Sequence, residues 1–227
     1  MAKKKHSVQG EPVVKMLDFG QFASLEDAMD KAEPGDRYLN VGSVLLPQAE
    51  AGPIPTTLLT FFWMSMLTRS QGLHGAIARE IRHENAHAVF PLLRAFAEAV
   101  ALVMYVSEHP NYVQALTQRP SEKGAPKRKS VQALISHAAK NAPGLKHVYA
   151  DLSEAAHFGA VAMWASIRPE DDDGEAGFSW SSHPRWRDDQ AYIACAQVIE
   201  LAEAMDQLLR RFAVWHLSVP ERVARSS

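Results

Sequence analysis

The sequence predicts an all-α protein, a bundle of about six helices with an N-terminal arm and a small β-hairpin before the last helix. Three observations support this class. Apolar residues recur at intervals of three and four through most of the chain after Pro55, which is the spacing of one helix face. Proline and glycine interrupt the first 55 residues repeatedly, so we expect no long helix there. Cys195 is the single cysteine, so an intramolecular disulfide is impossible and a Cys-rich metal site is excluded, as for a chain whose helices pack without such cross-links.

The composition is that of an ordinary globular protein. The chain has 227 residues, of which 47% are hydrophobic and 22% are charged. Its net charge of −2 argues against binding to nucleic acid over the whole surface, although it says nothing about local patches. Residues 1–12 begin with lysines but contain no apolar stretch, so they do not resemble a secretory signal. We therefore expect a cytoplasmic protein.

The pattern of helix boundaries indicates one domain. Residues 1–55 are expected to form the arm, which carries one short helix and belongs to the same domain. Residues 56–217 form the helical bundle, and residues 218–227 form a flexible C-terminal tail. No linker divides the chain convincingly into two domains.

Capping signals place the individual helices. Ser24 is the expected N-cap of the helix in the arm, Asp27 fills the acidic place of a capping box, and Pro34 ends the helix. A break near Asn85 or Pro91 separates the first two long helices. The six helices of the bundle are expected over residues 56–82, 86–107, 110–119, 130–141, 145–157 and 188–217.

The sequence pattern changes near residue 160, and the residues after this point predict a hairpin followed by the last helix. An acidic turn, Glu170–Gly174, lies between two segments of strand character, Ala160–Ile167 and Phe178–Trp180. The last helix then has the clearest helical period of the chain. Its apolar stripe is long enough to pair with a second copy, so a homodimer is the expected assembly.

The segment Ala86–Val106 is apolar enough to be compared with a membrane span. Arg94 and Glu98 lie in its middle, and each charge would cost about 2.5–3.5 kcal/mol at the centre of a bilayer. Pro91 weakens a span further. We therefore expect the core helix of a protein that does not contact a membrane.

A polar stripe runs along this apolar helix. His87, Arg94, Glu98 and Tyr105 are separated by offsets close to whole helical turns, so they share one face. A charged stripe on a helix that is otherwise buried needs partners, because an isolated buried charge is costly. One explanation is an Arg94–Glu98 ion pair that serves packing specificity, and the other is a ligand-binding or catalytic cleft.

A second polar stripe lies on the helix expected over Leu145–His157. Tyr149, Ser153 and His157 follow one another at steps of four residues. A phenol, a hydroxyl and an imidazole in a row can orient a substrate. They can equally form a satisfied hydrogen-bond ladder between helices, and a histidine at a helix C-terminus is often stabilised by the helix dipole alone.

The two stripes together resemble a known pattern. Leu92-Leu93-Arg94-x-x-x-Glu98, followed by Tyr149-x-x-Leu152-Ser153-x-x-x-His157, resembles an uncharacterised family of bacterial helical proteins that is similar to the HEPN-like helical domains. Many HEPN-like domains serve in RNA cleavage or defence systems. The resemblance implies that the polar residues converge on RNA or a nucleotide. It assigns catalysis to Arg94, Glu98 and His157, and substrate binding to Tyr149 and Ser153.

HEPN ribonucleases typically carry an Arg-x4–6-His motif on one helix. Arg82 and His87 have this spacing, although they lie early in the chain and at a helix junction. Arg210 and Arg211 also stand at a suitable distance from His216, but the residues between them lack the usual polar residue. In such a site, arginine stabilises a phosphate and histidine moves a proton.

Two alternatives to an RNA or nucleotide site remain. His83-Glu84-Asn85-Ala86-His87 matches the His-Glu-x-x-His motif of zinc hydrolases, in which two histidines one helical turn apart bind zinc and the glutamate polarises water. Glu108 or His109 would have to supply the third ligand. The other alternative is a non-catalytic interaction protein whose stripes are structural. In the leading hypothesis the site needs no metal ion or other cofactor.

Overall fold

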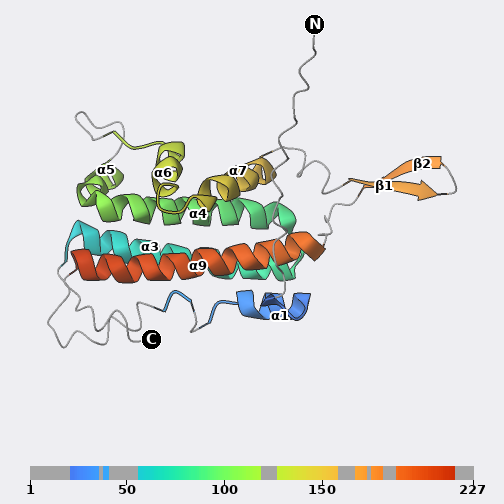
Figure 1. Cartoon of the computed structure of the whole chain (residues 1–227), viewed down its shortest axis with the longest axis horizontal. Helices are drawn as coiled ribbons and strands as arrows, with labels where there is room; N and C mark the ends of the chain where they lie inside the picture. The colour runs from blue at the N-terminus through green and yellow to red at the C-terminus, as the bar shows by residue number, and fades with distance from the viewer. Residues whose placement is uncertain are drawn as a thin grey trace, which may run out of the picture.

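The computed structural model of the chain describes residues 21–35, 38–40, 56–118, 127–157, 167–172, 175–180 and 188–217. These residues contain seven α-helices, a short 3₁₀ helix and one antiparallel hairpin, which confirms the predicted fold class (Figure 1). The helices are α1 (Leu25–Ala32), α3 (Leu58–Arg82), α4 (Ala86–Glu108), η3 (Pro110–Tyr112), α5 (Val113–Thr117), α6 (Val131–Ala138), α7 (Gly144–Ala156) and α9 (Asp188–His216). The strands are β1 (Ile167–Asp172) and β2 (Glu175–Trp180).

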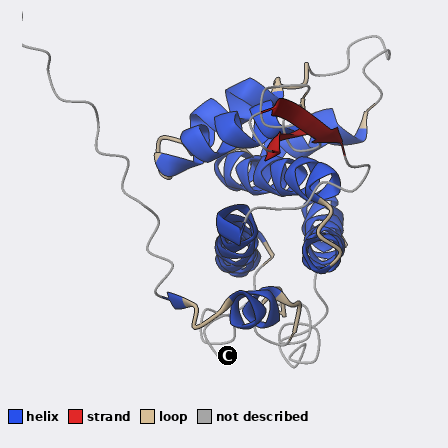
Figure 2. Cartoon of the chain, turned by 90° about the vertical axis from the view of Figure 1, so that its right-hand side faces the viewer, coloured by secondary structure: helices blue, strands red, loops and turns tan. Residues whose placement is uncertain are grey.

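The helices are stacked in layers around α4. Helices α3 and α9 pack against one side of α4, while α6 and α7 pack against the other. Helix α1 covers α9 and α3 on the face away from α4, and Figure 2 shows the same layers from the side, with α1 lowest. Helix α4 is therefore covered from both directions.

Helix α4 owes its central place to its side chains. Small and branched apolar residues such as Ala97, Ala101 and Val103 have no solvent exposure, so neighbouring helices can approach it closely. Within the described residues, α4 is the one helix that is long and apolar enough to cross a membrane, judged by length and composition alone. In the bundle this apolar surface packs against four other helices.

Helix α9 buries its apolar stripe inside the same chain. Met205, Leu209 and Phe212 are fully buried, and the ring of Phe212 lies 5.7 Å from that of Phe62 on α3. The indole N–H of Trp63 donates a hydrogen bond of 2.9 Å to the Leu209 carbonyl. The stripe that we expected to pair two copies is thus occupied by α3, α4 and α1.

Cys195 lies on this buried side of α9 and has no solvent exposure. Burial raises the pKa of its thiol to about 11, since the thiolate would lose its hydration. The thiol is therefore protonated at neutral pH and serves as a small apolar side chain.

The start of α1 follows the predicted capping. Ser24 accepts a hydrogen bond of 3.1 Å from the Asp27 backbone N–H, which confirms its role as N-cap. Asp27 in turn accepts from the backbone N–H of Ala23, one residue before the cap, and forms an ion pair with Lys31 at 2.8 Å. These interactions, with that of Lys31 first, lower the pKa of Asp27.

The break between α3 and α4 lies at residues 83–85. His83 is the C-cap of α3, and Glu84 has a φ of 55°, a conformation that non-glycine residues rarely adopt and that no α-helix contains. The Asn85 side chain stabilises the turn by donating to Glu80 Oε2 at 2.8 Å. Of the two predicted positions for the break, Asn85 is correct, and α4 continues through Pro91.

The hairpin precedes the last helix as predicted, but its strands differ from the expected ones. Strand β1 pairs with β2 from Ile167 opposite Trp180 to Asp172 opposite Glu175. Glu170–Asp172 therefore belong to a strand, where we had expected a turn. Residues 160–166, most of the predicted first strand, lie outside the described residues, as do much of the N-terminal arm and the C-terminal tail.

His74 makes stability depend on pH. Its side chain is 1% exposed, and Nε2 donates a hydrogen bond of 2.7 Å to the Ala32 carbonyl, which links α3 to α1. Burial lowers the pKa of His74 below its ordinary value of 6.5, so the unfolded chain binds more protons than the folded one between the two pKa values. The free energy of unfolding should thus fall as pH decreases through 6.5.

We expect His74→Gln to flatten this dependence, because glutamine retains a hydrogen-bond donor but does not titrate. Chemical denaturation between pH 7.5 and pH 5 measures the effect. The exposed His83→Gln serves as the control and should keep the wild-type slope. Equal slopes in His74→Gln and wild type would contradict the assignment.

Candidate functional site

The centre of the candidate site is an ion pair on α4. Arg94 and Glu98 stand one helical turn apart, and Arg94 Nε donates to Glu98 Oε1 at 3.1 Å. Both side chains are partly buried, with 24% and 31% of their surface exposed. Their neighbours Leu93 and Ala97 are fully buried, so this pair is the polar interruption of an apolar helix.

Helix α7 brings Tyr149 to this pair. The Tyr149 hydroxyl donates to Glu98 Oε1 at 2.9 Å and accepts a hydrogen bond from Arg94 Nε at 3.2 Å. The guanidinium carbon of Arg94 lies 5.4 Å from the centre of the Tyr149 ring, within the range of a cation–π contact. Because Tyr149 is buried, these contacts fix the orientation of Arg94 from its inner side.

His157 completes the cluster at the surface. It is the C-cap of α7, and its backbone N–H donates to the Ser153 carbonyl at 3.0 Å. Its Nε2 lies 2.7 Å from Arg94 Nη1. Because arginine is always a donor, Nε2 is the acceptor, so the proton of the neutral imidazole sits on Nδ1. The histidine ring is exposed, so the cluster reaches from the buried Tyr149 to solvent.

The two stripes predicted from the sequence therefore meet. Arg94, Glu98, Tyr149 and His157 form one hydrogen-bonded cluster, which we call the polar cluster. Ser153 does not join it through any hydrogen bond within the described part of the chain. Its Oγ is buried without a partner there, one helical turn from both Tyr149 and His157.

The surroundings of Arg94 in the polar cluster keep its guanidinium positively charged. Partial burial opposes the charged form of Arg94, but the hydrogen bond with Tyr149 and the charge of Glu98 outweigh it, so the pKa of Arg94 is raised. Glu98 balances this charge, and the cluster is close to neutral as a whole.

A cavity of about 640 Å³ reaches the polar cluster from the side of α3. It is lined by the start of α3, the middle of α4, α5 and α6, and Glu98 is its contact with the cluster. Arg69 and Arg128 also line it. The guanidinium of Arg128 already donates hydrogen bonds to the backbone carbonyls of Ala115, Leu116 and Gln118. The sequence stripes gave no indication of this cavity.

Of the arginine–histidine pairs with HEPN-type spacing, the structure separates Arg82 from His87, while Arg210, Arg211 and His216 share α9. Arg82 ends α3 and His87 begins α4, so the two residues do not share a helix. Arg82 instead binds the acidic residues of α1 and its C-cap, donating to Asp30 Oδ1 at 2.7 Å. Its hydrogen bond with Glu33 and those with its other partners raise the pKa of Arg82. On α9, Arg210 bonds Asp206, and His216 Nε2 donates to the Ser107 carbonyl at 3.0 Å.

The His-Glu-x-x-His segment does not have the geometry of a zinc hydrolase. Such a motif needs both histidines on one helical face, yet His83 caps α3, Glu84 has its positive φ, and His87 lies in the first turn of α4. Glu108 and His109, the expected third ligands, lie at the far end of α4. Within the described residues, the group of potential metal ligands that does come together is Glu108, His109 and His137.

The hydrogen bonds of Tyr149 should make the polar cluster a stabilising element. Tyr149→Phe removes the hydroxyl that bridges Glu98 and Arg94, and hydrogen bonds to charged groups contribute about 1.5–3 kcal/mol. We expect a loss in the lower half of this range, since both charges retain partial access to water. Urea denaturation measures it. Tyr105→Phe is the control. The Tyr105 hydroxyl forms no hydrogen bond with the described residues, so its removal should change stability far less.

No protein-family model, no curated protein and no solved structure matches the chain.

Proposed function

We propose that the protein binds RNA or a nucleotide at the polar cluster and acts on its phosphate. The observation that carries this proposal is the contact between Arg94 and His157 at the exposed end of the cluster. A phosphate binder and a proton acceptor stand side by side there, on a framework that holds the arginine rigidly. The resemblance of the two stripes to HEPN-like proteins supports the same substrate class.

Arg94 is arranged as a phosphate-binding fork. Its Nε is held from the inside by Glu98 and Tyr149, which leaves the Nη groups directed away from these partners. Nη1 donates a hydrogen bond to His157 Nε2. Nη2 forms no hydrogen bond with the described residues. A planar guanidinium fixed in this way is suited to bidentate contact with phosphate oxygens.

His157 can serve as the proton acceptor. Its neutral imidazole presents Nε2 towards Arg94, so a phosphate bound there would lie next to the basic nitrogen. With RNA, the phosphate would replace the hydrogen bond between Arg94 and His157, and the freed Nε2 would take the proton of a ribose 2′-hydroxyl as that oxygen attacks phosphorus. Arg94 would stabilise the charge on the phosphate oxygens while the bond to the 5′-oxygen breaks, and that oxygen would take a proton from water. Glu98 and Tyr149 position Arg94. The Ser153 hydroxyl lies one helical turn from both Tyr149 and His157 but is buried, so a substrate would reach it only if α7 shifted.

A non-catalytic interaction protein is the second candidate, because one surface favours it. Leu58, Phe61 and Met64 on the first turns of α3 are 46%, 57% and 47% exposed, which is unusual for large apolar side chains that share one region. A partner protein, or a second copy in a cytoplasmic homodimer, would cover them. In that case the polar cluster serves packing alone.

Direct measurement of RNA and nucleotide binding separates these candidates. We expect the protein to bind or cleave a single-stranded RNA, and Arg94→Lys to weaken this markedly, since lysine cannot make the bidentate contact. His157→Gln should leave binding largely intact but lower any cleavage rate by about 10²–10⁴-fold, the usual contribution of a general base. Fluorescence anisotropy and a gel-based cleavage assay measure the two effects.

His147→Gln is the matched control, because His147 is an exposed histidine on the same helix. It should leave both binding and cleavage unchanged. Absence of RNA and nucleotide binding, or equal binding by wild type and Arg94→Lys, would refute the phosphate site and favour the interaction protein.

A further inference from the structure

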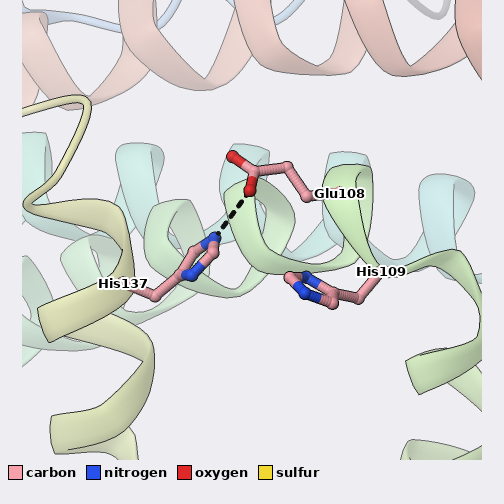
Figure 3. Close-up of side chains that lie close together, drawn as sticks. All are labelled: Glu108, His109 and His137. Atoms are coloured by element: carbon pink, nitrogen blue, oxygen red, sulfur yellow. Dashed lines mark ion pairs between the residues drawn. The ribbon is translucent and has the colours of Figure 1, made fainter.

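A cluster of three metal-ligand side chains lies at the far end of α4. Glu108 is the last residue of α4, His109 follows it as C-cap, and His137 lies in the last turn of α6. One ligand atom of each residue lies within 4.8 Å of those of the other two (Figure 3). Arg94 is 14 residues earlier on the same helix, about 21 Å along its axis, so this cluster is separate from the polar cluster.

We propose that Glu108, His109 and His137 bind a divalent transition-metal ion, with zinc as the best match. Two imidazoles and one carboxylate are a ligand set that zinc uses in proteins, with water in the fourth position. Zinc–ligand bonds of about 2.0–2.1 Å place tetrahedral ligand atoms about 3.3 Å apart. Glu108 Oε2 and His137 Nε2 are already 3.1 Å apart, and the ligand atom of His109 lies within 4.8 Å of both, so an approach of at most about 1.5 Å by His109 closes the site.

The environment of His137 provides independent support. Its side chain is 15% exposed, and Nε2 is buried. Within the described residues its polar contact is Glu108 Oε2 at 3.1 Å, an ion pair when the imidazole is protonated (Figure 3), although the geometry is not that of a hydrogen bond. When the imidazole is neutral, this buried nitrogen has no hydrogen bond, which is costly. A cation between the imidazole and the carboxylate would satisfy both groups.

Outer hydrogen bonds orient the other two ligands. His109 Nδ1 lies 3.1 Å from the Tyr105 carbonyl, which can only accept, so Nδ1 carries the proton and Nε2 keeps the lone pair that a metal needs. Asn141 donates to Glu108 Oε1 at 3.2 Å and leaves Oε2 facing His137. Histidine ligands in metal sites commonly have this kind of backbone partner.

Aromatic packing holds the two imidazoles in place. The Tyr105 ring stacks on His109 with centroids 4.3 Å apart and an interplanar angle of 9°. The same ring meets His137 edge-on at 5.0 Å, and the two imidazoles lie 5.3 Å apart. The histidines therefore lose little conformational freedom when a metal binds. Glu108, which is 47% exposed, leaves the site open to an ion from solvent.

The test is metal titration of the full chain, freed of its affinity tag and stripped with a chelator. We expect one equivalent of Zn²⁺ by calorimetry, and a Co²⁺ complex with the intense visible absorption of four-coordinate cobalt. His137→Gln and Glu108→Gln should each weaken binding by at least about 100-fold, the upper end of the loss caused by removing an outer partner. Glu108 lies at the surface, so Glu108→Gln should fold normally, and a loss of binding in this variant reports the loss of a ligand and not unfolding.

Two histidine variants outside the cluster serve as controls. His147→Gln and His87→Ala should bind Zn²⁺ as tightly as wild type does. Added Zn²⁺ should also raise the thermal unfolding midpoint of wild type and of both controls, but not that of His137→Gln. The proposal is overturned if wild type binds no Zn²⁺, if His137→Gln binds it equally well, or if His87→Ala alone loses it.

Discussion

The organisation of this protein depends on the burial of α4 together with two charges. A helix of alanine, valine, leucine and phenylalanine packs between α3 and α9 on one side and α6 and α7 on the other, which buries ten of its 23 residues. Arg94 and Glu98 cannot enter such a position unless their hydrogen-bonding capacity is met. Tyr149 and His157 meet part of it, and they do so only if α7 lies across α4 in this register. The polar cluster thus specifies which turn of α7 contacts which turn of α4, while the apolar contacts provide most of the driving force.

The helices that cover one side of α4 supply both candidate sites. Helix α7 brings Tyr149 and His157 to the middle of α4, and α6 brings His137 to its end. On the opposite side, α3 and α9 pack on α4, and the indole of Trp63 on α3 donates a hydrogen bond to the Leu209 carbonyl on α9. The side of α4 that faces α3 and α9 therefore serves mainly packing, whereas the side that faces α6 and α7 carries the polar side chains of both candidate sites.

Periodicity predicted the helices and the polar stripes, because it depends on local geometry alone. Offsets near multiples of 3.6 were sufficient to place Arg94 with Glu98 and Tyr149 with His157. Periodicity was misleading for the His-Glu-x-x-His segment. Its spacing is that of a helix, but the positive φ of Glu84 breaks the helix between the two histidines. The Glu108–His109–His137 group could not be predicted from the sequence either, since it depends on how α6 packs against the end of α4. The hairpin was predicted in the correct place, while its acidic residues entered the strand because cross-strand pairing outweighed their turn preference.

The buried Cys195 has a practical consequence. Its thiol is enclosed between α9 and the layers around it and is protonated at neutral pH, so two barriers separate it from an alkylating reagent. Modification requires α9 to move away from its neighbours, and the chain contains no other cysteine that would contribute to the signal. The rate of thiol labelling therefore reports how often the last helix detaches, which gives a direct view of the opening motions of the native bundle without any engineered probe.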